Sequence, residues 1–339
     1  MATDASREGG GGVARGGGSS PSPPAACPCP PPSPPIRGAK AFDYRHTVMD
    51  STAWDAALPL LRAGDVIVDT YSKAGTSWVQ AILAQLLLGV GTPAACRPHD
   101  ASLWVEMRSP GAPLGDRLAA VAAQPHRRFL KSHLPLGALP YSPDLKYVYV
   151  ARDARDVVLS LHHHHTHLHP QVIAGMNALP GRVGPPLGPA PADVVTYWRR
   201  WVADDGHPWW PFWAHIRGWW AARRRPNVLL LHFTDLLADL PGEVRRLAAF
   251  LDLPPLAEAD VATIVDRCSF GYMRAHAADV TPGGDALFRG GARSFIHKGT
   301  NGRWRGVLPP ADVAAYEATA VAELGDDCAR WLAEGGALE

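Results

Sequence analysis

The stretch DVIVDTYSKAGTSWVQAILAQLLL (65–88) decides the fold of this chain of 339 residues. Its apolar, β-branched first part predicts a strand over 65–71, and the run from Thr76 to Leu88 predicts a helix. The short turn between them contains Gly75. A strand, a glycine turn and a helix N-terminus together indicate an anion site, because unpaired backbone N–H groups and the helix dipole point at the bound group.

The lysine of this turn stands in an unusual place. In the ATP-binding loop G-x-x-x-x-G-K-[ST] the lysine directly follows the second glycine. Here Lys73 precedes Gly75, and Gly64 lies too far upstream to complete that pattern. An ordinary turn capped by Thr76 or Ser77 would account for the same residues. The stretch alone therefore leaves the identity of the anion open.

Three further segments share the short, continuously apolar character of the first strand, at 128–132, 146–151 and 227–233. Such runs are typical of strands that are buried on both faces of a parallel sheet. Helical patterns lie between these segments and after the last one, and they cover 155–167, 193–204, 211–224, 242–251, 256–268 and 311–334. The alternation predicts an α/β fold with a central parallel sheet flanked by helices on both faces, and ligands at the carboxyl ends of the strands.

The composition argues against several classes of protein. A net charge of +1 creates no field that would favour nucleic acid or a membrane surface as a partner. The longest apolar stretch, 81–90, is shorter than the roughly 20 residues that span a bilayer. The cysteines number five and are widely spaced, which predicts neither a disulfide framework nor a zinc site. We expect a soluble, cytoplasmic protein.

Residues 1–40 differ from the rest of the chain. They are rich first in glycine and then in proline, with almost nothing to bury, so we expect a disordered tail of polyproline character. An organelle-targeting segment is the alternative, but the tail lacks the amphipathic, arginine-rich pattern of a transit peptide. A single folded domain is expected over 41–335.

Two runs of one residue type are unusual. Seven of the 12 tryptophans fall within 198–220, where we expect helix packing and the lining of an apolar pocket. The run LHHHHTHLH (161–169) places His163 and His167 on one helix face. Adjacent histidines point in different directions, however, and no Asp, Glu or Cys stands at ligand spacing. We expect an exposed or partly packed run and no metal site.

A candidate general base lies in FLKSHLPLGALP (129–140). Lys131 and His133 fall two residues apart on the same side of an extended segment. A histidine at the carboxyl end of a strand in an α/β sheet is placed to accept a proton near neutral pH. A structural role is the alternative for an isolated histidine.

Two later stretches carry positive charge. YVYVARDARDVVLSL (147–161) repeats the order strand, charged turn, helix, with Arg152 at the strand end and Ser160 about two helical turns further on. The glycine-rich, basic loop FIHKGTNGRWRG (295–306) is most simply explained as a clamp over a phosphate. Solvated surface is the alternative explanation for that loop.

Together these stretches resemble the cytosolic-type sulfotransferases, which move a sulfuryl group from 3′-phosphoadenosine 5′-phosphosulfate (PAPS) to a small acceptor. YSKAGTSW is similar to the family's 5′-phosphosulfate loop Y-P-K-S-G-T-T-W, and LKSHLP to its K-T-H-L-P segment with the catalytic histidine. ARDARDVVLS is similar to R-x-x-x-D-x-x-x-S, which binds the 3′-phosphate, and FIHKGTNGRW to F-x-R-K-G-x-x-G-D-W. The resemblance covers about 42–331, is closest to bacterial-like members, and implies a P-loop-NTPase-like sulfotransferase fold.

The resemblance also implies roles for individual residues. Lys73 stabilises the leaving phosphate, His133 takes the proton of the acceptor, Lys131 assists near the sulfuryl oxygens, and Ser160 restrains Lys73 until the acceptor binds. The implied donor site, with adenine between Trp78 and Phe270, contains Lys73, Ala74, Gly75, Thr76, Ser77, Trp78, Arg152, Ser160, Phe233, Phe270, Phe295, His297, Lys298 and Gly299.

The implied reaction yields 3′-phosphoadenosine 5′-phosphate (PAP) and needs no metal, because a sulfuryl group carries less charge than a phosphoryl group. The implied acceptor is a small alcohol, phenol or amine. Its pocket is expected to be lined by the tryptophan-rich region and by the loops 101–127 and 168–192, which are the parts of such proteins that vary most.

Some positions depart from the family pattern. His297 stands where many members have an arginine on the 3′-phosphate, and Phe233 replaces a frequent tyrosine. The common dimer motif K-x-x-x-T-V-x-x-x-E is lost, because Pro309 and Pro310 replace its Thr-Val. We therefore expect a monomer, or a dimer that uses another surface.

A nucleotide kinase and a non-catalytic descendant of the enzyme are the competing functions. A kinase needs a lysine after the loop glycine and a carboxylate for Mg²⁺, and this sequence shows neither. A non-catalytic descendant would have lost Lys73 or His133, and both are present.

Overall fold

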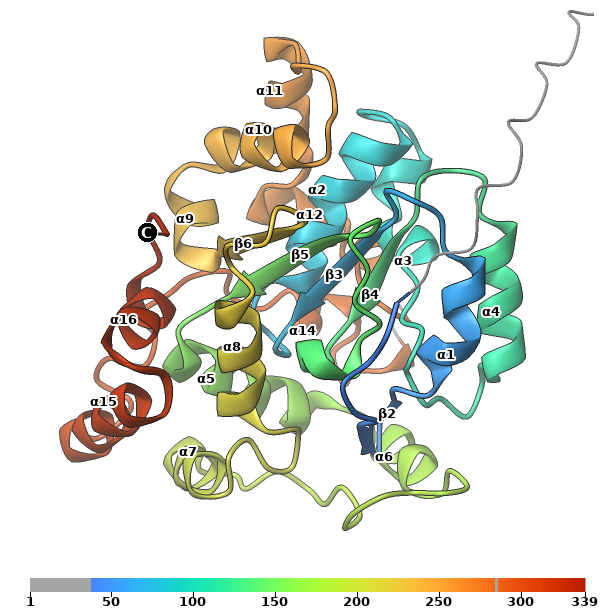
Figure 1. Cartoon of the computed structure of the whole chain (residues 1–339). Helices are drawn as coiled ribbons and strands as arrows, with labels where there is room; N and C mark the ends of the chain where they lie inside the picture. The colour runs from blue at the N-terminus through green and yellow to red at the C-terminus, as the bar shows by residue number, and fades with distance from the viewer. Residues whose placement is uncertain (1–37, 284–285, 339) are drawn as a thin grey trace, which may run out of the picture. The chain divides into compact units, whose positions relative to one another are not determined.

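The computed structural model describes residues 38–283 and 286–338 (Figure 1). Its centre is a four-stranded sheet in the order β4-β3-β5-β6, and every pair of neighbouring strands is parallel. The strands are β3 (Val66–Thr70), β4 (Phe129–Ser132), β5 (Lys146–Ala151) and β6 (Val228–His232). The predicted parallel α/β fold is confirmed, and each predicted strand matches an observed strand to within a residue at either end.

Alternate side chains of each strand enter two different cores. In β5, Val148 and Val150 belong to the core on one face, whereas Tyr147 and Tyr149 belong to the core on the other. Because successive side chains of a strand point to opposite faces, a strand covered on both sides needs apolar residues at every position. This is why these segments read as continuous apolar runs.

Helices cover both faces of the sheet (Figure 1). The core on the first face contains side chains from α2 (Thr76–Leu88), α9 (Phe233–Ala238), α10 (Leu240–Phe250), α11 (Glu258–Arg267) and α12 (Phe270–Ala275). The core on the second face contains side chains from α1 (Ala53–Ala57), α5 (Ala154–His167), α7 (Val194–Ala203), α8 (Phe212–Ala221), α15 (Pro310–Leu324) and α16 (Asp326–Glu334). Trp198, Trp201 and Trp219 are almost wholly buried in this second core, as expected for helix packing.

Several short elements have no counterpart in the sequence-based expectations. They are the antiparallel pair β1 (Arg45–His46) and β2 (Met49–Asp50), the 3₁₀ turns η1 (Leu58–Leu60), η2 (Ala94–Cys96) and η3 (Leu136–Ala138), and the helices α3 (Pro98–Ala101), α4 (Leu114–Ala123), α6 (Pro170–Asn177), α13 (Ala277–Val280) and α14 (Ala292–Phe295). Most of these segments carry too few residues to show a helical or strand period. The helix α4 is missed although its ten residues equal the length of α7.

The single helix expected over 311–334 is wrong. The chain forms α15 and α16 instead, and Gly325 separates them with a φ of 78°. This left-handed conformation ends α15 and redirects the chain, and it is the conformation that glycine tolerates best.

The predicted disordered tail lies outside the described residues except at its end. There Ala39 forms an antiparallel bridge with Tyr141, and Lys40 makes ion pairs with Asp43 and Asp55. Within 38–283 and 286–338, no helix has both the length and the apolar character that a membrane crossing requires.

We expect Gly325→Ala to lower the free energy of unfolding by about 1 kcal/mol, because an L side chain is disfavoured at this positive φ. Denaturant unfolding measures the change. Gly271→Ala is the matched control, since Gly271 lies within α12 with open space around it and alanine favours a helix. A control that destabilises as much as Gly325→Ala would contradict the explanation.

Candidate active site

The carboxyl ends of the four parallel strands supply the main side chains of one cavity. The turn after β3 carries Lys73, β4 runs into His133, β5 into Arg152 and β6 into Phe233. The cavity has a volume of about 460 Å³. It lies where ligands are expected in a parallel α/β sheet.

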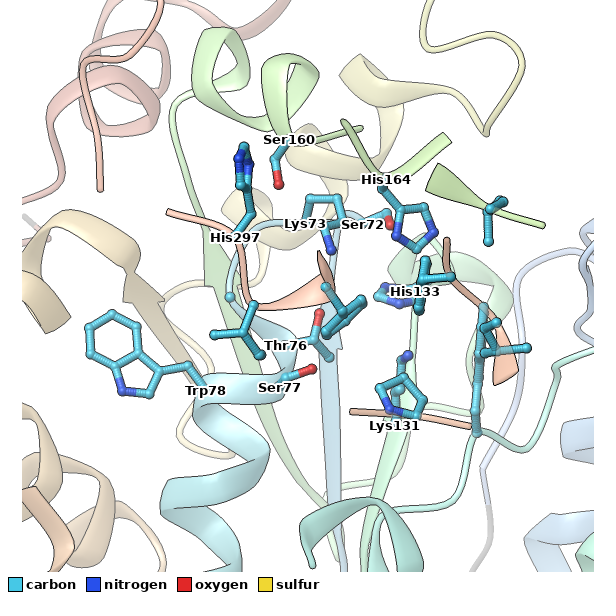
Figure 2. A pocket seen from close by; sticks show the side chains of 18 of the residues that line it. Ser72, Lys73, Thr76, Ser77, Trp78, Lys131, His133, Ser160, His164 and His297 are labelled. Atoms are coloured by element: carbon cyan, nitrogen blue, oxygen red, sulfur yellow. The ribbon is translucent and has the colours of Figure 1, made fainter. Parts of the chain in front are cut away.

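Nearly all residues that the sequence places at the site line this cavity. Figure 2 shows a part of them. The full set is Lys73, Gly75, Thr76, Ser77, Trp78, Lys131, His133, Arg152, Ser160, Phe233, Phe270, Phe295, His297, Lys298 and Gly299. Ala74 is the exception, because its side chain is buried in the core of the second face.

The N-terminus of α2 is an open cradle for an anion. Gly75 is the N-cap and has no side chain to cap the helix, and the backbone N–H groups of Gly75, Thr76 and Ser77 find no acceptor within the described part of the chain. The hydroxyl of Thr76 lies 2.6 Å from that of Thr70. The alternative of a turn capped by a threonine or serine side chain is therefore wrong.

Gly75 is required at this turn for two reasons. Its φ is 121°, which L residues rarely adopt, and a Cβ atom would lie 3.1 Å from the ring of Phe233. The missing side chain lets the backbone N–H groups face the cavity directly.

Lys73 is a buried cation next to other cations. Burial, followed by the charges of Lys131 and Arg152, lowers the pKa of Lys73 to about 7. Its ammonium lies 3.8 Å from the centroid of the Phe295 ring. Its own φ is 68°, so this turn holds a non-glycine residue in a left-handed conformation. Such strain is often found at functional sites.

The ring of His133 is held in one tautomer. Its Nδ1 lies 2.7 Å from the carbonyl oxygen of Thr70, which can only accept a hydrogen bond. Nδ1 therefore carries the proton, and Nε2 is left with its lone pair. Burial, followed by the charge of Lys131, lowers the pKa of His133 well below its ordinary value, so the ring is neutral at neutral pH.

Glu106 anchors the backbone that carries His133. This fully buried carboxylate accepts hydrogen bonds from Trp54 Nε1 (2.9 Å), Trp104 Nε1 (2.7 Å), Ser132 Oγ (2.8 Å) and the backbone N–H of His133 (3.0 Å). Sequence analysis missed it. The available signal was an acidic residue within the otherwise apolar segment LWVEM (103–107).

Glu106 also acts on the second lysine of the site. Burial lowers the pKa of Lys131 to about 8, although the charge of Glu106 raises it. The ammonium of Lys131 lies 4.3 Å from the centroid of the Trp104 ring, and the same ring packs edge-on against His133. Trp104 therefore contacts Glu106, Lys131 and His133.

Arg152 joins two loops of the site. Its guanidinium donates to the carbonyl oxygens of Lys73 (3.3 Å) and Thr300 (2.7 Å) and to Oδ1 of Asn301 (3.0 Å). Burial lowers its pKa to about 10, so it stays charged. Asp156, in the first turn of α5, accepts hydrogen bonds from the backbone N–H of Gly302 (2.6 Å) and Arg303 (2.9 Å).

These contacts explain the spacing R-x-x-x-D in this segment. The arginine holds the phosphate loop, and the aspartate fixes the late basic loop beside it. Sequence analysis named Arg152 but missed Asp156, although the motif itself contains the aspartate.

Histidines stack at one end of the cavity. The ring of His297 lies 3.6 Å from that of His163, centroid to centroid and nearly parallel, and His163 lies 3.9 Å from His167. Burial and the neighbouring cations lower the pKa of both His163 and His297 to about 4. Nδ1 of His297 is buried without a partner in the described residues.

The rest of the histidine run is partly packed, as expected. His162 Nε2 lies 2.8 Å from the carbonyl oxygen of Pro191, and His165 Nε2 lies 2.8 Å from that of Gly188. These bonds attach the loop after α6 to α5. Among residues 38–283 and 286–338, no three His, Cys, Asp or Glu side chains gather in a way that would hold a metal ion.

The two ends of the cavity differ in character. Aromatic rings line the end next to α2, where Trp78 and Phe233 pack at 5.2 Å and the guanidinium of Arg152 lies 4.2 Å above Phe233. Phe270 is 40% exposed at the same end. The rest of the lining is largely apolar and includes Val48, Met107, Val172, Met176, Trp209, Trp210, Leu287 and Phe288, with Arg108, Ser109 and Gln171 among its polar members. The expectation that the loops 101–127 and 168–192 contribute to a pocket together with the tryptophan-rich region is confirmed.

The structure is an α/β fold with an open helix N-terminus and a cavity at the carboxyl ends of its parallel strands. Residues 63–326 match the family model described as a sulfotransferase domain. The chain therefore belongs to this family, the PAPS-dependent sulfotransferases, as its motifs predict.

Individual relatives agree with this assignment. A glycolipid sulfotransferase of Mycobacterium bovis is 28% identical over 86% of this chain and 94% of that protein. Sulfotransferase 1A1 of Mus musculus is 28% identical over 84% of this chain and 91% of that protein.

Two solved structures share the fold. Retinol dehydratase in complex with retinol and PAP has a TM-score of 0.63 and 23% identity, and the match covers 82% of this chain and 87% of that one. Mouse sulfotransferase SULT7A1 complexed with PAP has a TM-score of 0.60 and 19% identity, with 80% and 88% covered.

We expect two lysines to titrate near neutral pH in the ligand-free protein. In NMR spectra of protein with ¹³C-labelled lysine, the signal lost in Lys73→Arg should titrate at about 7, and the signal lost in Lys131→Arg at about 8. Lys40 is the internal control, because its hydrogen bonds to Asp43 and Asp55 outweigh burial and raise its pKa. A Lys73 signal that titrates like an ordinary lysine would contradict the electrostatic description of the site.

Proposed function

We propose that this sulfotransferase transfers the sulfuryl group of PAPS to a hydroxyl or amine of a small, largely apolar acceptor, with His133 as general base and Lys73 stabilising the leaving phosphate. The observation that carries the proposal is the hydrogen bond from His133 Nδ1 to the Thr70 carbonyl oxygen. It leaves Nε2 as a base in the cavity that Lys73 and the open end of α2 also line.

The residues at the aromatic end fit the donor. The free N–H groups of Gly75, Thr76 and Ser77 are suited to the 5′-phosphosulfate, and Lys73 stands beside them. No Asp or Glu is among the described residues that line the cavity, so the N–H groups and the ammonium of Lys73 remain available for an anion. Ala74 is part of this loop through its backbone alone, since its side chain is buried.

We assign the 3′-phosphate to a group of mostly polar residues that line the cavity. The group consists of Arg152, Ser160, His297, Lys298 and Gly299. Three donors of the Arg152 guanidinium already bind the protein, so Arg152 contributes its charge and its remaining N–H groups. Nδ1 of His297, buried without a protein partner, supports a role in binding.

The adenine is assigned to the aromatic side chains nearby. Trp78, Phe233 and Phe270 all line this end of the cavity. The ring of Phe270 packs against Gly299, where a Cβ atom would lie only 2.4 Å from that ring. The loop that contains Gly299 can therefore approach the ring this closely only with glycine at this position. The buried Nε1 of Trp78 has no partner among the described residues, and a base offers acceptor nitrogens to such a donor.

His133 acts on the acceptor. Its neutral Nε2 accepts the proton of the acceptor hydroxyl or amine as the acceptor oxygen or nitrogen attacks sulfur. The bond from Nδ1 to Thr70 and the bond from its backbone N–H to Glu106 hold the ring in place for this step. Positioning of this kind supplies a large part of the rate in group transfer.

Lys73 and Lys131 stabilise the charge that moves during transfer. When the bond between sulfur and the bridging oxygen of the 5′-phosphate breaks, its electron pair stays on that oxygen, and Lys73 stabilises the negative charge there. Lys131 is assigned to the sulfuryl oxygens. Ser160, on the donor side, is assigned to restraining Lys73 before the acceptor is bound, a step that would require the ammonium to leave the face of Phe295.

The apolar end of the cavity supports an acceptor with an extended apolar part. Met107, Met176 and Leu287 offer flexible, adaptable walls. The relatives named above include a glycolipid sulfotransferase, and one structure of the shared fold contains retinol. We propose the alcohol, phenol or amine of a hydrophobic small molecule as the acceptor, and incubation of a panel of such compounds with labelled PAPS identifies it.

For assembly, we propose a monomer or a dimer that does not use the lost family motif. Pro309 is the N-cap of α15 and Pro310 its first residue, so this segment presents a helix start in place of the motif. Light scattering distinguishes the two states.

Cys96, Cys268 and Cys328 are free thiols, which supports a reducing compartment such as the cytoplasm, and cell fractionation tests it.

We expect His133→Ala to lower kcat by on the order of 10² to 10⁴ and to leave PAP affinity nearly unchanged, because the base acts on the acceptor and does not bind the donor. The measurements are turnover with labelled PAPS and calorimetric titration of PAP. His162→Ala is the matched control, since His162 bonds to Pro191 and is not among the residues that line the cavity. Unchanged turnover at neutral pH in His133→Ala would show that His133 is not the base.

We expect PAP affinity to fall as pH rises, because a bound phosphate raises the pKa of His297 from about 4. The contribution of His297 to affinity is greatest below pH 4 and decreases up to the raised pKa of the complex, above which His297 stays neutral in both states. His297→Arg should remove this decrease and gain about 1 kcal/mol near pH 8, since a permanent charge strengthens the hydrogen bond.

Calorimetric titration of PAP over this range measures both variants. Ionisation of PAP itself affects both proteins equally, so the ratio of their affinities isolates His297. A ratio that does not change with pH would place another residue, such as Arg303, on the phosphate.

A further inference from the structure

The imidazole of His164 lines the active-site cavity and has no assigned role. It projects from α5 into the region that also contains His133 and Lys73 (Figure 2). Its side chain makes no hydrogen bond within 38–283 and 286–338, and its Nδ1 is buried without a partner. Buried polar atoms are nearly always hydrogen-bonded in native proteins, so this ring lacks a partner that a ligand can supply.

The position of His164 on α5 explains its place in the cavity. Ser160, His164 and Leu168 follow one another at intervals of four residues, which places them along one side of the helix and of the residue that ends it. All three line the cavity. Ser160 belongs to the donor side and Leu168 to the apolar wall, so His164 stands between the donor and the acceptor.

The surroundings of the ring keep it neutral and fix its place. It packs against Phe288 at 5.0 Å, Phe295 at 6.0 Å and Trp209 at 6.1 Å, centroid to centroid. Burial, followed by the charge of Lys73, lowers the pKa of His164 well below its ordinary value. A neutral imidazole offers one hydrogen-bond donor and one acceptor.

His164 and His133 lie on different elements but close to the same cation. The charge of Lys73 acts on both rings. Nδ1 of His133 donates a hydrogen bond to the carbonyl oxygen of Thr70, and its Nε2 is assigned to the reacting group of the acceptor. His164 has no such bond, so it remains available for a second polar group of the same molecule.

We propose that His164 is a specificity-determining residue that binds a second hydroxyl or comparable hydrogen-bonding group close to the reacting hydroxyl of the acceptor. The favoured acceptor is then an amphiphile with two neighbouring polar groups on an apolar body. The polar groups meet His133 and His164, and the apolar body lies against the wall formed by residues such as Leu168 and Phe288. This inference rests on the proposed function, because it assumes that the acceptor reacts beside His133.

Matched pairs of probes test the proposal by binding to the protein saturated with PAP. The pairs are 2-naphthol with 2,3-dihydroxynaphthalene and 1-octanol with 1,2-octanediol, which differ by one neighbouring hydroxyl. For the wild-type protein we expect calorimetry to show that the diol of at least one pair binds about three- to tenfold more tightly, as one additional neutral hydrogen bond provides. His164→Phe should bring that ratio to about one, because phenylalanine fills the same space without a polar atom.

Two further variants separate recognition from a structural effect. His164→Gln retains a donor and an acceptor and should keep part of the preference for the diol. His162→Phe alters the same helix outside the cavity and should keep all of it. Unchanged PAP affinity shows that each variant is folded.

The proposal is overturned if no diol is preferred by the wild-type protein, or if His164→Phe shows the same ratio as the wild type. It is also overturned if His162→Phe loses the preference as fully as His164→Phe. These outcomes differ from failure of the proposed function, which would appear as a wild-type protein that prefers the diol but transfers no sulfuryl group from labelled PAPS to any probe.

Discussion

The parallel pairing of β3 with β4 on one side and with β5 on the other is the constraint on which the site depends. Parallel strands end at the same edge of a sheet, so residues that follow these strands meet there although they are far apart in the sequence. Thr70 and Ser132 close to these ends bring the phosphate loop next to His133. The tautomer of the proposed base is thus set by a carbonyl group of the neighbouring strand.

A second constraint is the burial of positive charge without matching carboxylates. Lys73, Lys131 and Arg152 line one cavity, and burial lowers the pKa of each of them. Glu106 and Asp156, whose charges act on Lys131 and Arg152, are occupied with backbone N–H groups and hold loops in position. The folded protein therefore keeps an unfavourable concentration of cations in its interior. A bound anion relieves it, which links stability to donor binding.

The strands and α2 were predictable because each has a simple local cause. A strand covered on both faces needs a continuous apolar run, and α2 follows a glycine turn with a long helix-forming sequence. The site residues were predictable where a motif reports a backbone arrangement, as for Gly75 and Arg152. Here the family resemblance contributed most of the detail, since the residues alone left the anion unidentified.

Other features have causes that the sequence does not display locally. The break at Gly325 looks like one tolerated glycine within a long helical pattern, and only its φ of 78° shows that the helix ends there. Glu106 is recognisable as an anchor once four donors, from its own segment and two others, surround it. The sequence suggests one common environment for the histidine run, whereas its members lie in different environments. His162 and His165 bond to the loop after α6. His163 stacks on His297, and His164 lines the cavity.

The donor end and the apolar end belong to one continuous cavity, and this continuity matters for the design of inhibitors. A single compound could place an adenosine bisphosphate on the open end of α2 and extend an apolar chain toward Met176 and Phe288. Joining two ligands in this way turns the second binding event into an intramolecular one, so the affinities of both halves combine. Under the proposed role of Lys73, a linker atom near its ammonium would occupy the place of the transferred group. Compounds that differ only in the apolar half would then distinguish this enzyme from relatives with the same proposed donor loop.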